Sequence, residues 1–356
     1  MTSCIPKRYI PTKTVLAEGM GKVILCRDSN LERDVVIKFI DNPRQKHRLL
    51  DEIKVYQNIR SKHVAQIFDF FSDSKGEQIG IVLEYISGSD LISLSDTTLD
   101  KDQFLKILFQ IALGINDIHR FGIIHRDIKP NNMKFDQEGL IKIFDFGLSR
   151  LSRKNDSTLG GFSGTYQFSA PELYEVDHAG ETHFTNAVDV YSFGVTAWYI
   201  SGKNLPEQLC ELPPSFSNLP SFTSLPQLIP VKIADILDRC IACDPQERPT
   251  MEEVLKLISK YLLFGRHRAL VIANSKPYNL DKVGQIIRVG GTQSGLLIKY
   301  DGLDFIIEGV LGTVLVNNSL LSEGSILPKS CVFTIRQDNS APQFVTFDVS
   351  NPEVLL

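Results

Sequence analysis

One polar stretch near the middle of the chain constrains the fold more than any other feature. Residues 125–132 read HRDIKPNN, and DFG follows at residues 145–147. Between them lie two short β-rich runs, Met133–Phe135 and Ile141–Phe144, joined by the turn sequence DQEG at residues 136–139. Together they predict a hairpin. Because a hairpin returns the chain toward its start, the polar residues on either side of it can face one site.

The residue types in this stretch are those that phosphoryl transfer requires. The reaction needs metal ligands at the nucleotide phosphates, a carboxylate near the attacking hydroxyl and positive charge on the transferred phosphate. Asp127 can orient a hydroxyl and accept its proton, and Lys129 can meet the γ-phosphate. Asn132 and Asp145 offer the hard oxygen ligands that suit Mg²⁺. The stretch therefore predicts a site for ATP with Mg²⁺, or with Mn²⁺ in its place.

Local sequence patterns divide the rest of the first 263 residues into a part rich in strands and a mainly helical part. Short strands are expected over residues 13–17, 22–27, 34–40, 64–71 and 78–85, with one helix over residues 44–60. After a joint at Ile86–Ser89 the pattern is mainly helical. Asp100 and Gln103 have the spacing of a capping box at the start of a helix that stops near Gly122. Helices resume at Val231, after an irregular connection over residues 206–230 that contains six prolines.

The last part of the chain has a different character. Short runs rich in Val, Ile and Leu alternate with Gly, Asn, Ser and Asp turns. The expected strands cover residues 269–273, 285–289, 296–299, 304–308, 313–316, 332–336 and 344–349. Such spacing predicts a small antiparallel sandwich or barrel. We therefore expect an α+β domain over residues 1–263, a linker over 264–268 and an all-β module over 269–356.

Composition narrows the possible partners. The 356 residues suit about two domains. A net charge of −4 does not indicate nucleic acid or anionic lipid as a partner. There is no apolar run of signal-peptide or membrane-spanning length, and six scattered cysteines suit a reducing compartment. These features predict a cytoplasmic protein without a membrane partner.

Several further motifs stand in order around the polar stretch. They are APE at residues 170–172, DVYSFG at 189–194, DP at 244–245 and RPT at 248–250. With HRDIKPNN and DFG they resemble the motif set of eukaryotic-type (Hanks-type) protein Ser/Thr kinases over about residues 9–263. The resemblance implies a bilobal fold, with an N-lobe of about residues 1–86 and a C-lobe of about 87–263. It also implies an ion pair between Glu172 and Arg248.

The same resemblance assigns the N-lobe residues. Residues 36–38 read VIK where the family has V-A-I-K, which implies that Lys38 pairs with the α- and β-phosphates and with a glutamate of the next helix. Glu52 is the best candidate for that glutamate, with Asp51 and Glu77 as alternatives. Lys38, Glu52 and the two polar-stretch residues Asp127 and Lys129 are thus the expected catalytic residues.

The glycine-rich loop departs from the family pattern. Residues 16–23 read LAEGMGKV, so Ala17 replaces the first glycine, and one residue is missing between Gly19 and Gly21. Glycines in this loop let backbone N–H groups approach phosphate, so we expect an altered nucleotide affinity or an unusual lid. The expected nucleotide-binding residues are Ala17, Gly19, Gly21, Val23 and Lys38, the gatekeeper Leu83, and the hinge residues Glu84 and Ile86, which meet adenine through the backbone.

Substrate class and activation follow from residues 148–169. Lys129 and the pair Gly164-Thr165 are similar to those of kinases that act on Ser and Thr of proteins. Arg126 before Asp127 implies a basic pocket for a phosphorylated activation segment. Candidate autophosphorylation sites are Ser157, Thr158, Ser163 and Thr165, of which we favour Thr158 and Ser163.

The C-terminal module resembles a forkhead-associated domain in two places, residues 287–291 (IRVGG) and 312–318 (GTVLVNN). Gly291 stands where that family has its phosphate-binding arginine, and no S-x-x-H motif precedes Ile306. The module could bind a phosphoprotein or another docking partner, or it could stabilise the kinase.

Two other functions remain open for the kinase-like part. A pseudokinase scaffold would bind nucleotide or partners without turnover, and the altered glycine-rich loop is the feature that favours it. A small-molecule phosphotransferase is disfavoured by residues 164–172, which relatives use to dock peptides.

Overall fold

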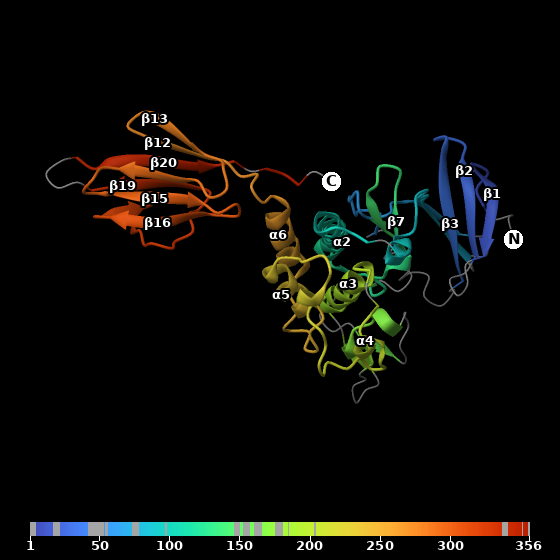
Figure 1. Ribbon diagram of the computed structural model, residues 1–356. Helices are drawn as coiled ribbons and strands as arrows, with labels where there is room; N and C mark the ends of the chain where they lie inside the picture. The colour runs from blue at the N-terminus through green and yellow to red at the C-terminus, as the bar shows by residue number, and fades with distance from the viewer. Residues whose placement is uncertain are drawn as a thin grey trace. The chain divides into compact units, whose positions relative to one another are not determined.

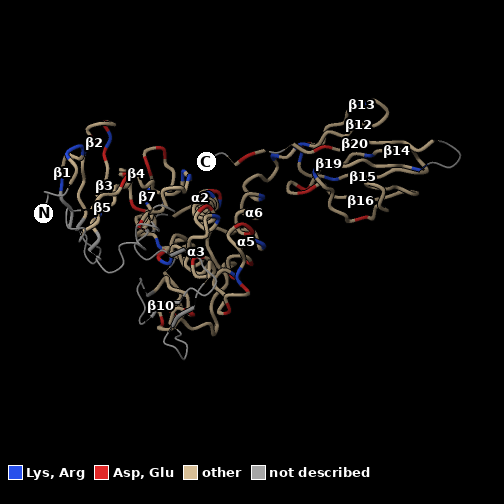
Figure 2. The backbone as a smooth tube through the Cα atoms, turned by 180° about the vertical axis from the view of Figure 1, so that it is seen from behind, with Lys and Arg blue, Asp and Glu red and all other residues tan. Residues whose placement is uncertain are grey.

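The chain divides between Lys256 and Leu257 into two units (Figure 1). The computed structural model describes residues 5–16, 22–41, 53, 56–72, 78–96, 98–145, 150–151, 157–159, 166–174, 181–183, 185–202, 204–336, 341–350 and 352–354. Acidic and basic residues are interspersed along both units (Figure 2). Within the described residues, no helix has the length and apolar character needed to cross a membrane.

The first unit begins with a five-stranded antiparallel sheet in the order β1-β2-β3-β5-β4. Its strands are β1 (Tyr9–Leu16), β2 (Lys22–Asp28), β3 (Arg33–Asp41), β4 (Ile67–Ser72) and β5 (Gln78–Glu84). Alternate residues of β3 are buried, namely Val35, Ile37 and Phe39. Since successive side chains of a strand point to opposite faces, this alternation turns Lys38 away from the core that Ile37 and Phe39 enter.

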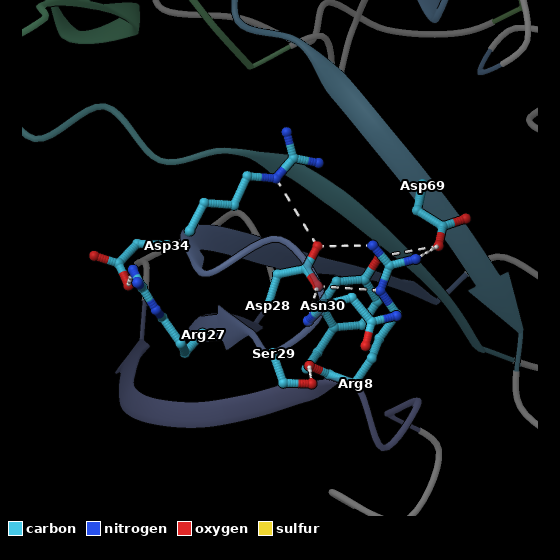
Figure 3. A network of polar contacts seen from close by, with 9 residues as sticks. Arg8, Arg27, Asp28, Ser29, Asn30, Asp34 and Asp69 are labelled. Atoms are coloured by element: carbon cyan, nitrogen blue, oxygen red, sulfur yellow. Dashed lines mark hydrogen bonds and ion pairs between the residues drawn. The ribbon is translucent and has the colours of Figure 1, made fainter.

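A polar network ties the N-terminal segment to this sheet (Figure 3). The carboxylate of Asp28 is completely buried and accepts hydrogen bonds from Arg8 Nη2 at 2.7 Å and Arg8 Nε at 3.3 Å. Asp69 on β4 accepts a hydrogen bond from Tyr9 Oη at 2.9 Å. Because a buried carboxylate needs a partner, the segment before β1 has one defined position on the sheet.

Within the helix expected over residues 44–60, the structure describes residue 53 and residues 56–60, and of these Ile53 and Tyr56 are helical and buried. The prediction was wrong at its C-terminal end. Ile59 donates its N–H to Tyr56 O at 3.1 Å, as in a turn that closes a helix. Ile59 is nevertheless buried. Its apolar side chain fitted the helical spacing of the sequence, although the residue lies in a buried turn.

The remainder of the first unit is mainly helical. Its α-helices are α2 (Lys101–Arg120), α3 (Ala187–Ile200), α4 (Glu207–Cys210), α5 (Val231–Cys240) and the start of α6 (Met251–Leu262). Short strand pairs join β6 (Ile123–Ile124) to β9 (Arg150–Leu151), β7 (Met133–Phe135) to β8 (Ile141–Ile143) and β10 (Ser157–Leu159) to β11 (Glu181–His183). Asp100 and Gln103 form the expected capping box of α2. The β7–β8 hairpin is confirmed.

The second unit is built from two antiparallel sheets that share one core. One sheet has the order β13-β12-β20-β19-β17-β18, and the other β14-β15-β16. The strands are β12 (Ala269–Ala273), β13 (Lys276–Leu280), β14 (Ile286–Gly290), β15 (Gly295–Tyr300), β16 (Phe305–Leu311), β17 (Val314–Val316), β18 (Ser319–Leu320), β19 (Ser330–Ile335) and β20 (Gln343–Val349). The sequence pattern missed β13 and β18, which lie at sheet edges. Pro277 obscures the strand character of β13, because a proline fits only where no ladder N–H is needed.

The second unit also includes the end of α6. Lys260 forms an ion pair with Asp304 at 2.6 Å, and Gly265 donates its N–H to Gly302 O at 2.8 Å. Gly302 has φ +100°, and a Cβ there would lie 2.4 Å from the Phe264 ring. These contacts group Leu257–Phe264 with the strands, whereas the sequence pattern placed the domain boundary after residue 263.

Candidate active site

The polar stretch forms a short loop between β6 and β7 in which three side chains hold one another. Lys129 Nζ lies 2.9 Å from Asp127 Oδ1 and 2.8 Å from Asp127 Oδ2. Asn132 Nδ2 donates to Asp127 Oδ2 and to Asp127 O, both at 2.8 Å. All three residues are buried, so the Asp127 carboxylate has a fixed orientation before any substrate binds.

A carboxylate on α3 holds the backbone of this loop. Asp189 Oδ2 accepts the N–H of His125 at 2.8 Å and lies 2.9 Å from His119 Nε2, while Oδ1 accepts the N–H of Arg126 at 2.7 Å. Burial acts to raise the pKa of Asp189, but the hydrogen bonds from His119 and from the backbone N–H of Arg126 help to bring it below its usual value. An ionised Asp189 therefore holds Arg126 in a left-handed conformation, φ +68°, which is strained for a residue with a Cβ.

His125 connects the loop to the segment after β8. Its Nε2 lies 3.2 Å from Phe144 O, and its Nδ1 lies 3.4 Å from the N–H of Asp127. Burial lowers the pKa of His125. A neutral, enclosed imidazole positions the two segments rather than exchanging protons with a substrate.

Residues far apart in the sequence meet next to this loop. Lys38 on β3 donates a hydrogen bond from Nζ to Asp145 Oδ1, the carboxylate that follows β8. Both side chains are largely shielded from solvent, at 15% and 10% exposure, and Asp145 has a positive φ of +67°. The expected partner of Lys38, Glu52, lies outside the described residues.

The proposed hinge follows the end of the five-stranded sheet. Leu83 pairs with Val36 of β3, and Glu84, the last residue of β5, pairs with Val35. Ile86 follows and is buried. On the neighbouring strand, Val23 pairs with Lys38.

Other expected site residues cannot be placed in this geometry. Ala17, Gly19 and Gly21 lie outside the described residues, as do Ser163 and Thr165. Ser157 and Thr158 lie on β10, which pairs with β11.

The donor set suits a hard divalent cation. Because Asn132 uses its amide nitrogen for Asp127, its Oδ1 is the atom that could hold a metal, and Asp145 could add a carboxylate oxygen. Mg²⁺ is commonly bound by one or two such ligands together with substrate phosphates. Among the described residues, no cluster of three or more His, Cys, Asp or Glu side chains could hold a metal ion.

A bidentate ion pair joins the segment around Glu172 to the loop before α6. Arg248 donates from Nη1 and Nη2 to the two oxygens of Glu172 at 2.7 and 2.8 Å. Arg248 also donates to Ala242 O and Cys243 O. The predicted Glu172–Arg248 pair is confirmed.

Two contributors to the site were not found by sequence reasoning. Asp189 was recognised only as the start of a helix motif, and its hold on His125 and Arg126 depends on how α3 packs. Lys142 of β8 forms an ion pair with Glu84, and the only sequence signal for it is a charged residue between two buried isoleucines.

Comparison with known proteins identifies the class to which this site belongs. The sequence matches the family model of the protein kinase domain over residues 13–258. The chain therefore belongs to the protein kinase family, whose members use ATP and a divalent metal. The matched region includes most of the five-stranded sheet, the polar loop and most of α6, and it excludes the strands β12–β20.

Particular relatives are Ser/Thr kinases. The chain is 36% identical over 197 residues to the serine/threonine-protein kinase drp72 of Corynebacterium efficiens, covering 52% of this chain and 37% of that protein. It is 34% identical over 199 residues to PknA of Corynebacterium glutamicum, covering 53% and 41%. It is 27% identical over 258 residues to CBL-interacting serine/threonine-protein kinase 8 of Arabidopsis thaliana, covering 70% and 56%. The alignments thus span between about a third and somewhat over half of these relatives' lengths.

Proposed function

We propose that this protein is a protein Ser/Thr kinase that transfers the γ-phosphate of ATP, with Mg²⁺ as the metal, to hydroxyl groups of protein substrates. The observation that carries the proposal is a set of contacts among five polar residues from β3, from the loop between β6 and β7 and from the segment after β8. They are the Lys38–Asp145 pair and the contacts of Asp127 with Lys129 and Asn132. A scaffold without turnover has no need for all five polar groups.

Each residue has a role that its contacts support. Asp127, held by Lys129 and Asn132, accepts the proton of the attacking Ser or Thr hydroxyl. Lys129 carries positive charge beside that carboxylate, where the moving phosphoryl group needs it. Asn132 and Asp145 would hold Mg²⁺, which screens the phosphate charge when bound. Lys38 would exchange its Asp145 contact for the α- and β-phosphates and the carboxylate of Glu52.

The nucleotide is proposed to lie between the five-stranded sheet and the helical part. In this arrangement residues of about 1–86 and 87–263 form the two lobes. Ala17, Gly19, Gly21 and Val23 would cover the phosphates, and the backbone of Glu84 and Ile86 would contact adenine next to Leu83.

Activation and docking complete the proposal. Autophosphorylation at Thr158 or Ser163 would place a phosphate within reach of Arg126. The all-β module over residues 269–356, joined by 264–268, would bind a phosphoprotein or other docking partner, or would stabilise the kinase domain. The described cysteines are all free, which suits a cytoplasmic location.

Kinase assays on the purified full chain test this function. Lys38→Met and Asp127→Asn are expected to lower phosphate transfer from radiolabelled ATP to a protein acceptor by at least about a thousandfold. Circular dichroism should show that both variants remain folded. Turnover by either variant at the wild-type rate would contradict the assignment, and transfer to a metabolite in preference to protein would contradict the substrate class.

A further inference from the structure

A second ion pair crosses between the sheet and the helical part, away from the catalytic lysine. Lys142 Nζ of β8 lies 2.8 Å from Glu84 Oε1 at the end of β5. The two side chains are only 11% and 22% exposed. An ion pair with this much burial is screened less than a surface pair, so losing one partner leaves the other charge poorly solvated.

The other oxygen of the same carboxylate is also engaged. Glu84 Oε2 accepts the N–H of Gln66 at 3.1 Å, and the N–H of Glu84 donates to Gln66 O at 2.9 Å. The Gln66 side chain in turn donates from Nε2 to the carbonyls of Ile59, Ser61 and Val64, each at 3.3 Å. The end of β5 is therefore fixed from two sides, by the loop before β4 and by Lys142.

Two ion pairs of opposite polarity connect the five-stranded sheet to β8 and to the residues just after it. Lys38 of β3 contacts Asp145, while Glu84, whose strand pairs with β3 at Val35, contacts Lys142, three residues before Asp145. One connection has its cation on the sheet, and the other has its cation on β8. A shift of β8 along the sheet that brought Lys142 toward Lys38 would place two positive charges side by side. The two ion pairs together therefore favour one alignment of β8 against the hinge.

We propose that Lys142 is a positioning residue for nucleotide binding, which acts through Glu84 to hold the adenine-contacting hinge in place before ATP arrives. The inference rests on the proposed function, because it assumes that the hinge binds adenine. A hinge that is already ordered pays less entropy on binding. The ion pair of Lys142 is with the hinge residue Glu84, so we expect Lys142 to influence nucleotide affinity rather than the transfer step.

Direct nucleotide titration of the full chain tests this inference. Lys142→Met is expected to raise the Kd for ATP and the KM for ATP about three- to tenfold, the cost of ordering one or two groups. The kcat at saturating ATP should stay within about twofold of wild type, because Asp189 holds the polar loop independently.

Lys134 offers a matched control. It lies directly opposite Lys142 in the β7–β8 hairpin, but its ion pair, with Asp90 at 3.2 Å, is more exposed. Lys134→Met should leave the Kd for ATP unchanged. Lys142→Arg, which keeps the charge, should retain most of the wild-type affinity.

A double-mutant cycle with Glu84→Gln separates positioning from general stability. If Lys142 acts through Glu84, Lys142→Met should add little to the Kd in the Glu84→Gln background. Should Lys142→Met fail to fold alone, the double variant removes the uncompensated carboxylate and supplies the comparison with Glu84→Gln.

Unchanged affinity, additive effects, or an equal loss in Lys134→Met would overturn the inference. Failure of the wild-type chain to bind ATP would instead overturn the proposed function.

Discussion

At the scale of single residues, backbone strain coincides with the chemistry. Arg126 and Asp145 both have positive φ, at +68° and +67°, and they flank the hairpin that closes the site. Residues with a Cβ adopt this conformation only where their surroundings enforce it. Asp189 enforces it at Arg126 by accepting two backbone N–H groups, and the pairing with Lys38 holds Asp145.

Asp189→Asn tests this hold on the loop. The amide nitrogen would face one of the two N–H donors, so a donor would meet a donor inside the protein. We expect a loss of about 2–4 kcal/mol in the free energy of unfolding together with a lower kcat, measured by urea denaturation and kinase assay. Asp235→Asn, at an exposed position of α5, is the control. Equal stability of the two variants would contradict the role given to Asp189.

The buried Asp28 predicts a pH dependence of stability (Figure 3). Its hydrogen bonds with Arg8 hold the pKa of Asp28 below its usual value. The stabilisation is therefore complete above the unfolded pKa, about 3.9, and is lost as the pH falls through the lower folded pKa. Arg8→Met should destabilise the first unit at neutral pH, and the difference from wild type should shrink below about pH 4. Denaturation series at several pH values measure it, and a constant difference would refute it.

At the scale of elements, the Glu172–Arg248 pair joins two segments that lie 76 positions apart in the sequence. The Arg248 side chain is fully buried and also donates to Ala187 O at 3.0 Å, at the first turn of α3. One guanidinium thus connects the segment after the activation region, the start of α3 and the loop before α6.

Arg248→Ala is expected to cost about 3–5 kcal/mol of unfolding free energy, because Glu172 would be left without its partner. Arg27→Ala is the matched control, since the Arg27–Asp34 pair is about half exposed and should cost at most about 1 kcal/mol. Chemical denaturation compares the two. A small loss at Arg248 would show that the pair is dispensable for the fold.

At the scale of the whole molecule, the separate cores of the two units predict two unfolding events. The core of the second unit is formed by its own strands, with Phe347 completely buried between Phe305 and Phe333. Phe347→Ala should therefore cost about 3–5 kcal/mol in that unit alone.

Differential scanning calorimetry can assign the two events. ADP with Mg²⁺ at a hundredfold excess over Kd should stabilise the first unit alone by about 2.7 kcal/mol, which raises the transition temperature of that unit. Phe347→Ala should lower the transition temperature of the second unit. A single transition that moves with both perturbations would show that the units unfold together.

The sequence by itself determined the features that depend on neighbours along the chain. The capping box at Asp100, the β7–β8 hairpin and the alternating strands follow from local periodicity and turn chemistry, and the ordered motifs around Asp127 specify the family. The sequence did not predict edge strands such as β13, because mostly exposed residues show no alternation of apolar and polar side chains. Tertiary structure alone decided which distant groups meet. Three such contacts join residues at least 58 positions apart: Lys38 with Asp145, Asp189 with the backbone of His125, and Lys142 with Glu84. These pairings depend on how sheets and helices pack, which no local sequence pattern encodes.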